Sequence, residues 1–97
     1  MTPDPAKTTK LSEHHHIEIG SSSWNASETS IRNRYDDPKT GRFSPHSSSE
    51  IPLNDIELIM KATSLYDLLK PAACARIIEV FAASIVRQTG QTGTPSV

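Results

Sequence analysis

Residues 56–88 read IELIMKATSLYDLLKPAACARIIEVFAASIVRQ and carry most of the apolar side chains of this 97-residue chain. Of the 38 residues between 51 and 88, 23 are apolar, whereas residues 1–50 contain only ten. A 50-residue segment with so few apolar side chains cannot offset the entropy that it loses on ordering. We therefore expect a polar, Ser/Thr-rich leader (1–50), a helical interaction module (51–89) and a flexible tail (90–97).

Two helices are predicted in the module. Asn54 is a favoured N-cap and Glu57 completes a capping box, so the first helix is expected from Asp55 to Leu69. Pro71 ends this helix and is also a favoured first residue for the next one, which is expected to run to about Gln88 with Gly90 as its C-cap. The short connection favours a helical hairpin, and a single helix kinked at Pro71 is the open alternative.

The apolar surface of both predicted helices is wider than one neighbouring helix can cover. Such a surplus exceeds what a monomer usually exposes, so the sequence predicts a homodimer in which two hairpins form a helical bundle. Which face is core, dimer interface or docking surface stays open. The candidate residues for the dimer interface or partner binding are Leu58, Ile59, Leu65, Tyr66, Leu69, Ile78, Phe81 and Ile85.

The leader carries only local signals for strands. Residues 16–19 alternate polar and apolar, which is typical of a short strand, and residues 31–43 suggest a hairpin whose turn contains Pro38 and Gly41. Isolated short strands are marginally stable, so we expect the leader to be mostly irregular. The predicted fold class is therefore all-α.

Composition excludes several classes of function. Ten Lys and Arg against eleven Asp and Glu give a net charge of −1, which argues against binding nucleic acid through a basic surface. The chain shows no signal-peptide pattern and no long apolar run, so a cytoplasmic protein without membrane contact is expected. No set of acid, base and nucleophile stands out, so we expect neither an enzyme nor a cofactor.

Three groups of side chains have alternative interpretations. Three consecutive histidines, His14–His16, point in different directions in any regular backbone, which argues against a metal site. The single cysteine, Cys74, is either a reactive thiol near a helix start or a small buried side chain, and the apolar stripe around it favours the second. The basic residues of positions 32–42 suggest nucleic acid, but Asp36 and Asp37 interrupt them.

The size of the chain, its polar leader and residues 56–88 resemble the small QslA-type quorum-sensing anti-activators of pseudomonads. The resemblance implies a helical protein that binds the ligand-binding domain of a LuxR-type transcription factor and blocks its dimerisation and DNA binding. No functional residue is transferred by it. The alternative function is a small DNA-binding regulator or antitoxin with a helical dimerisation module, which would require a clearly basic leader.

Overall fold

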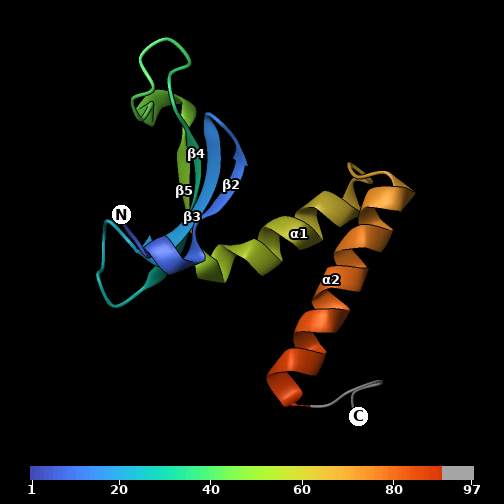
Figure 1. The fold of residues 1–97 in the computed structure, drawn as a ribbon. Coiled ribbons are helices and arrows are strands. Elements are labelled where there is room, and N and C mark those ends of the chain that lie inside the picture. The colour runs from blue at the N-terminus through green and yellow to red at the C-terminus, as the bar shows by residue number, and fades with distance from the viewer. Residues whose placement is uncertain (91–97) are drawn as a thin grey trace. The chain divides into compact units, whose positions relative to one another are not determined.

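The computed structural model describes residues 1–90 and divides the chain into a first unit, Met1–Ile59, and a second unit that begins at Met60. The first unit is a five-stranded antiparallel sheet, and two helices follow it in the chain (Figure 1). The prediction of an all-α fold with a mostly irregular leader is therefore wrong. The strands are β1 (Thr2–Pro3), β2 (Thr9–Ser12), β3 (His15–Ser21), β4 (Thr29–Tyr35) and β5 (Ser49–Pro52).

The sheet is built around β3 and β4, which pair along their whole length. β5 pairs with the other edge of β4, while β1 and β2 pair with opposite ends of the free edge of β3. Short 3-10 turns at Pro5–Lys7 and Pro45–Ser47 lie between strands. The alternation predicted for residues 16–19 falls inside β3, as the period of two requires.

Opposite charges align across β3 and β4, and they explain why the leader folds with few apolar residues. Glu18 is paired in register with Arg32, and its carboxylate also contacts Arg34 on the same face. On this face Glu18 and Ser30 are buried, with exposed fractions of 4% and 0% for the whole residues. The other face holds four half-buried isoleucines at positions 17, 19, 31 and 51. A count of apolar residues therefore underestimates the stability of this sheet, because part of that stability comes from a buried charge that is paired.

The turn after β4 keeps the local geometry that its sequence predicts. Gly41 adopts φ 71°, and its N–H donates to the carbonyl oxygen of Asp37 at 2.7 Å. The strand pairing differs from the expected hairpin, because only one bridge, Asp36 to Phe43, follows the turn. β4 pairs with β3 and β5 instead.

The first helix, α1 (Ile56–Leu65), is shorter than predicted. A 3-10 turn at Leu53–Asp55 precedes α1. Asn54 lies inside this turn, whose N-cap is Pro52, so the N-cap role predicted for Asn54 is wrong. The helix stops at Leu65 because Asp67 takes a left-handed backbone, φ 52°, and the N–H of Leu68 bonds back to the carbonyl oxygen of Thr63. Five residues, 66–70, connect the two helices, whereas the sequence predicted a connection of one residue, Lys70.

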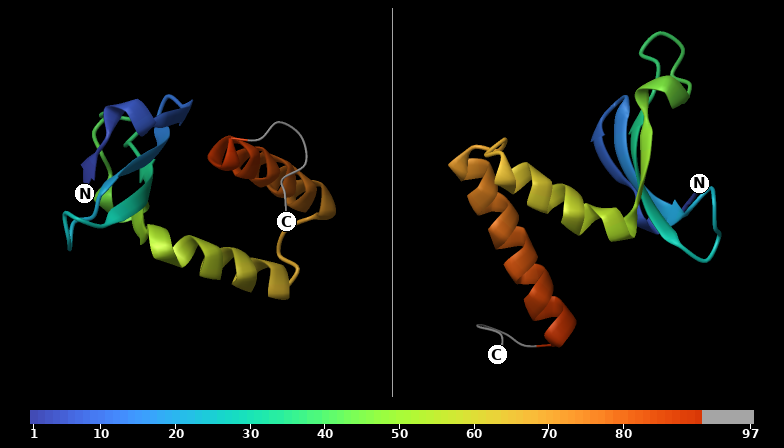
Figure 2. Two further views of the ribbon diagram at one scale, coloured as in Figure 1. Left: turned by 90° about the horizontal axis from the view of Figure 1, so that it is seen from below. Right: turned by 180° about the vertical axis from the view of Figure 1, so that it is seen from behind.

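The second helix, α2 (Pro71–Thr89), agrees with the sequence prediction at both ends. Pro71 occupies the first turn, and Gly90 is the left-handed C-cap whose N–H donates to the carbonyl oxygen of Val86. α2 leaves the end of α1 in a new direction and few contacts join the two helices, so they form an open corner and not a closed hairpin (Figure 2). The predicted tail, except Gly90, lies outside the described residues.

Candidate interaction surface

The eight residues predicted for interfaces all have exposed side chains. Their exposed fractions range from 37% for Leu69 to 72% for Leu65. Leu58, Ile59 and Leu65 belong to α1, and Tyr66 and Leu69 lie in the connection, although both were expected on a helix. The remaining three lie on α2: Ile78, Phe81 and Ile85.

No apolar side chain within residues 1–90 is fully buried. The buried residues there are Glu18, Ser22 and Ser30, all of them polar. Burial of apolar surface is the main favourable term in folding, and one buried Leu, Ile or Phe side chain contributes about 1.5–3 kcal/mol. The helices therefore present their apolar stripes in a form suited to burial against another surface.

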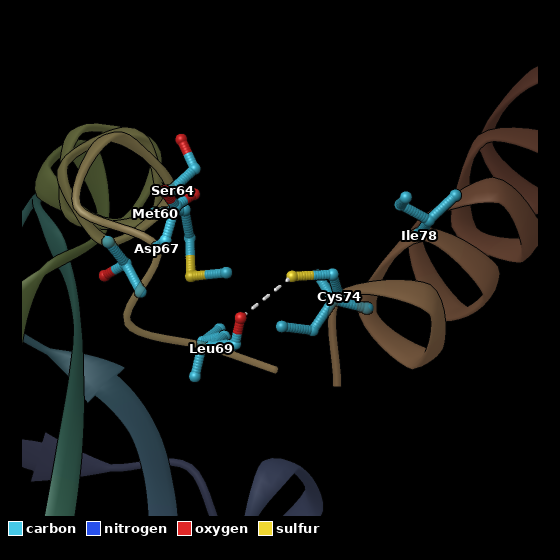
Figure 3. A pocket seen from close by; sticks show the side chains of 8 residues that line it. Met60, Ser64, Asp67, Leu69, Cys74 and Ile78 are labelled. Carbon is cyan, nitrogen blue, oxygen red and sulfur yellow. Dashed lines mark hydrogen bonds between the residues drawn. The ribbon is translucent and has the colours of Figure 1, made fainter. Parts of the chain in front are cut away.

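An apolar groove of about 310 Å³ lies at the corner where α1 ends and α2 begins. Met60 from α1, Leu69 from the connection and Cys74 and Ile78 from α2 line it (Figure 3). The left-handed turn at Asp67 creates this space, because it ends α1 and redirects the chain before Pro71 starts α2. The groove brings together two of the eight predicted residues, Leu69 and Ile78.

Three apolar groove residues were missed as site residues by the sequence prediction: Met60, Cys74 and Ile77. Met60 lies on the apolar side of α1, and Cys74 was expected to be buried, whereas its side chain is exposed in the groove. Its thiol contacts the carbonyl oxygen of Leu69 at 3.6 Å, as Figure 3 shows. The sequence signal that pointed to all three was their position on the helical apolar stripes.

Polar side chains lie in the groove and in the histidine segment of β3. The polar side chains that line the groove are Thr63, Ser64 and Asp67, which do not form an acid, base and nucleophile set. His15 stacks on Tyr35 with ring centroids 4.1 Å apart, whereas His16 approaches Asp36 at 3.7 Å on the other face of β3. Across residues 1–90, no group of three or more potential ligands is placed to hold a metal ion.

Arg32 and Arg34 are occupied within the sheet. Arg32 contacts Glu18 at 2.7 Å, and Arg34 contacts both Glu18 at 3.4 Å and Asp36 at 2.9 Å. Both guanidinium groups also lie over the ring of Phe43, at 4.5 and 5.1 Å from its centroid. The hydrogen bond from Arg34 lowers the pKa of Asp36, and the same bond raises the pKa of Arg34. These two cations are neutralised and do not form a free basic surface.

Within residues 1–90, no helix has both the length and the apolar character needed to cross a membrane.

The candidate interaction surface consists of the exposed apolar side of α1, the connection, the groove at the corner and the exposed stripe of α2. Comparison with protein-family models, with curated proteins and with solved structures finds no match to this chain.

Proposed function

We propose that this chain is a small regulatory protein without enzymatic activity, which acts in the cytoplasm by binding and inhibiting a partner protein through apolar helix surface. The observation that carries the proposal is the exposure of the eight apolar side chains named above, from 37% to 72%, in a chain without a buried apolar residue among those described. Large apolar surfaces of this kind mark sites of protein association. We also propose that the working form is a homodimer.

The partner is assigned to α1 and the connection that follows it. Leu58 and Leu65 lie seven residues apart on the same side of α1, and Tyr66 extends this surface at the end of the helix. Tyr66 is exposed to 71%, and a tyrosine brings a large apolar area at low conformational cost. A helix that presents side chains at this spacing binds in an apolar groove of its partner and occludes it.

The narrower proposal names the partner as the ligand-binding domain of a LuxR-type transcription factor. The resemblance to the QslA-type anti-activators of pseudomonads supports it, together with the exposed apolar helix surface. In this mechanism the helix covers the surface through which the transcription factor dimerises, so the transcription factor no longer binds DNA. The inhibitor itself needs no contact with nucleic acid.

The experiment compares Tyr66→Ala and Leu65→Ala with Leu11→Ala, which removes an apolar side chain exposed to 54% from β2. Partners are first captured from the host of this protein, and affinities are then measured with the purified partner by calorimetry. If Tyr66 anchors the partner, Tyr66→Ala weakens binding by about 2 kcal/mol, roughly thirty-fold, while its melting transition changes little. Leu11→Ala leaves the affinity unchanged.

The proposal fails if Tyr66→Ala and Leu65→Ala both bind the captured partner as tightly as the unmodified chain. The narrower proposal has its own test, in which the LuxR-type regulator of the same host is mixed with this protein and assayed for DNA binding. Unimpaired DNA binding at saturating inhibitor rejects the transcription factor as the partner. It does not affect the assignment of the docking surface.

A further inference from the structure

The exposed stripe of α2 is suited to a second copy of the same helix. Along α2, the residues at alternating spacings of four and three are Cys74, Ile78, Phe81, Ile85 and Gln88. Ile78, Phe81 and Ile85 are exposed to 69%, 54% and 49%. This alternation is the pattern of a helix that packs side by side along another helix.

The positions beside this stripe favour close helix packing. Ala75, Ala82 and Thr89 flank it on one side, and Ile77 and Ser84 flank it on the other. The charged residues of α2 are Arg76, Glu79 and Arg87, and all of them project from the remaining positions around the helix. Two copies of α2 therefore meet without burying a charge, and the small residues let the helix axes approach.

An antiparallel orientation of the two helices pairs the stripe with itself and brings Ile85 of one copy to the groove end of the other. With a two-fold axis between Glu79 and Val80, Ile78 lies opposite Phe81 of the second copy, and Ile85 lies opposite Cys74. This axis passes through the middle of the 19-residue helix, so the two copies overlap over their whole length. Contact along the full length, about 28 Å at 1.5 Å per residue, buries on the order of 1,000 Å², which is the lower limit for a specific interface.

The groove can accommodate the contact between Ile85 of one copy and Cys74 of the other. Cys74 lines the groove beside Met60 and Leu69. The volume of the groove, about 310 Å³, exceeds the volume of about 150 Å³ of an engineered cavity that binds benzene. An isoleucine side chain therefore fits there. We propose that α2 packs antiparallel on α2 of a second copy, so that Ile85 of each copy enters the groove of the other beside Cys74.

This arrangement separates two uses of the apolar surface. The α2 stripe and the groove serve self-association, and Leu65 and Tyr66 stay available for the partner. The inference rests on the proposed function only in taking the working form to be a homodimer.

The test uses the full chain with Cys74 as its single native thiol. Ile85→Cys is treated with a short bis-maleimide, which joins two thiols, and the products are separated by denaturing electrophoresis. We expect a product of twice the 10.6 kDa chain mass for Ile85→Cys and none for the unmodified chain, whose two copies of Cys74 lie far apart in the antiparallel arrangement. The matched control, Ala83→Cys, places the new thiol on the far side of α2 and gives no such product. Adding Cys74→Ala to Ile85→Cys abolishes the product.

A second variant keeps the inference testable if Ile85→Cys alters folding. Phe81→Glu places a charge near the two-fold axis, so sedimentation equilibrium should show a shift to the monomer mass, whereas Ala83→Glu keeps the dimer. Cross-linking of the unmodified chain through Cys74 overturns the antiparallel arrangement, as does a product with Ala83→Cys equal to that with Ile85→Cys. A dimer that gives no product with Ile85→Cys overturns this inference and leaves the proposed function standing. If sedimentation equilibrium shows a monomer, both the antiparallel arrangement and the proposed homodimer are rejected. The assignment of the partner-binding surface is still tested by the affinity of Tyr66→Ala.

Discussion

Glu18 lies between two arginines in the middle of the sheet. Its carboxylate accepts from Nε of Arg32 at 2.8 Å and from Nη1 of Arg34 at 3.4 Å. The side chain of Glu18 is exposed to only 5%, and those of Arg32 and Arg34 to 15% and 29%. Removing one member of such a group is costly because it leaves the others close together without compensation.

Glu18→Gln should therefore destabilise the sheet by about 3 kcal/mol, as expected when a buried ion pair loses one partner. The free energy of unfolding is measured by urea titration. Arg42→Gln, which removes an exposed charge from the neighbouring turn, is the control and should change it little. The double variant Glu18→Gln with Arg32→Gln should recover part of the loss, because it removes one of the two facing cations and leaves Arg34 its contact with Asp36. Equal stability of Glu18→Gln and the control would contradict this role.

Asp36 makes the stability of the sheet depend on pH. The hydrogen bond from Arg34 lowers the pKa of Asp36 in the folded chain below its usual value of 3.8. A lowered folded pKa stabilises the fold above the unfolded pKa, and this contribution is lost as the pH falls through the folded pKa. Stability should thus fall below about pH 4 through Asp36, in addition to other carboxylates. Arg34→Met should flatten this part of the acid titration, and an unchanged profile would show that the contact contributes nothing.

Among the elements, β1 depends on a glycine in its neighbour β3. A Cβ at Gly20 would lie 2.0 Å from the carbonyl oxygen of Thr2 and 2.7 Å from Cα of Pro3. Both are backbone atoms, so β1 has to move to make room. The hydrogen bond from the N–H of Asp4 to the carbonyl oxygen of Ile19 also holds this segment, and the Met1 ammonium forms an ion pair with Glu50 of β5.

Gly20→Ala should release β1 and destabilise the sheet by about 1–3 kcal/mol, the usual range for overpacking. Hydrogen exchange is the direct measurement, since the amide of Asp4 should lose its protection while amides within the β3–β4 pairing keep theirs. Gly41→Asn is the matched control, because no atom lies within 4 Å of the new Cβ and asparagine tolerates the positive φ there. Protection of the Asp4 amide in Gly20→Ala would contradict the close approach.

At the scale of the whole molecule, folding is expected to be coupled to association. No apolar side chain is buried among the described residues, so under the proposed homodimer we expect a second copy to supply the apolar term that stabilises most domains. The midpoint of thermal unfolding should therefore rise with protein concentration, which calorimetry at several concentrations measures. Sedimentation equilibrium supplies the mass. A concentration-independent midpoint together with the 10.6 kDa monomer mass at micromolar concentration would reject the dimer.

The features that depend only on neighbouring residues were predictable from local sequence patterns. Pro71 and Gly90 define the two ends of α2, and Gly41 closes the turn after β4, since each acts through its own backbone geometry. The exposed apolar stripes of the helices were likewise predictable from spacing alone, because the surplus of apolar width is a property of the sequence.

The sheet formed by the leader and the open corner between the helices could not be predicted from local sequence patterns. Glu18 and Arg32 are fourteen residues apart, and their pairing stabilises the sheet only once β3 and β4 are in register. A count of apolar residues does not detect such a contact. The end of α1 was set in the same way, because the left-handed turn at Asp67 replaced the last helical turn that helix propensity favoured. The groove exists because of that turn, so no local pattern in the sequence specified it.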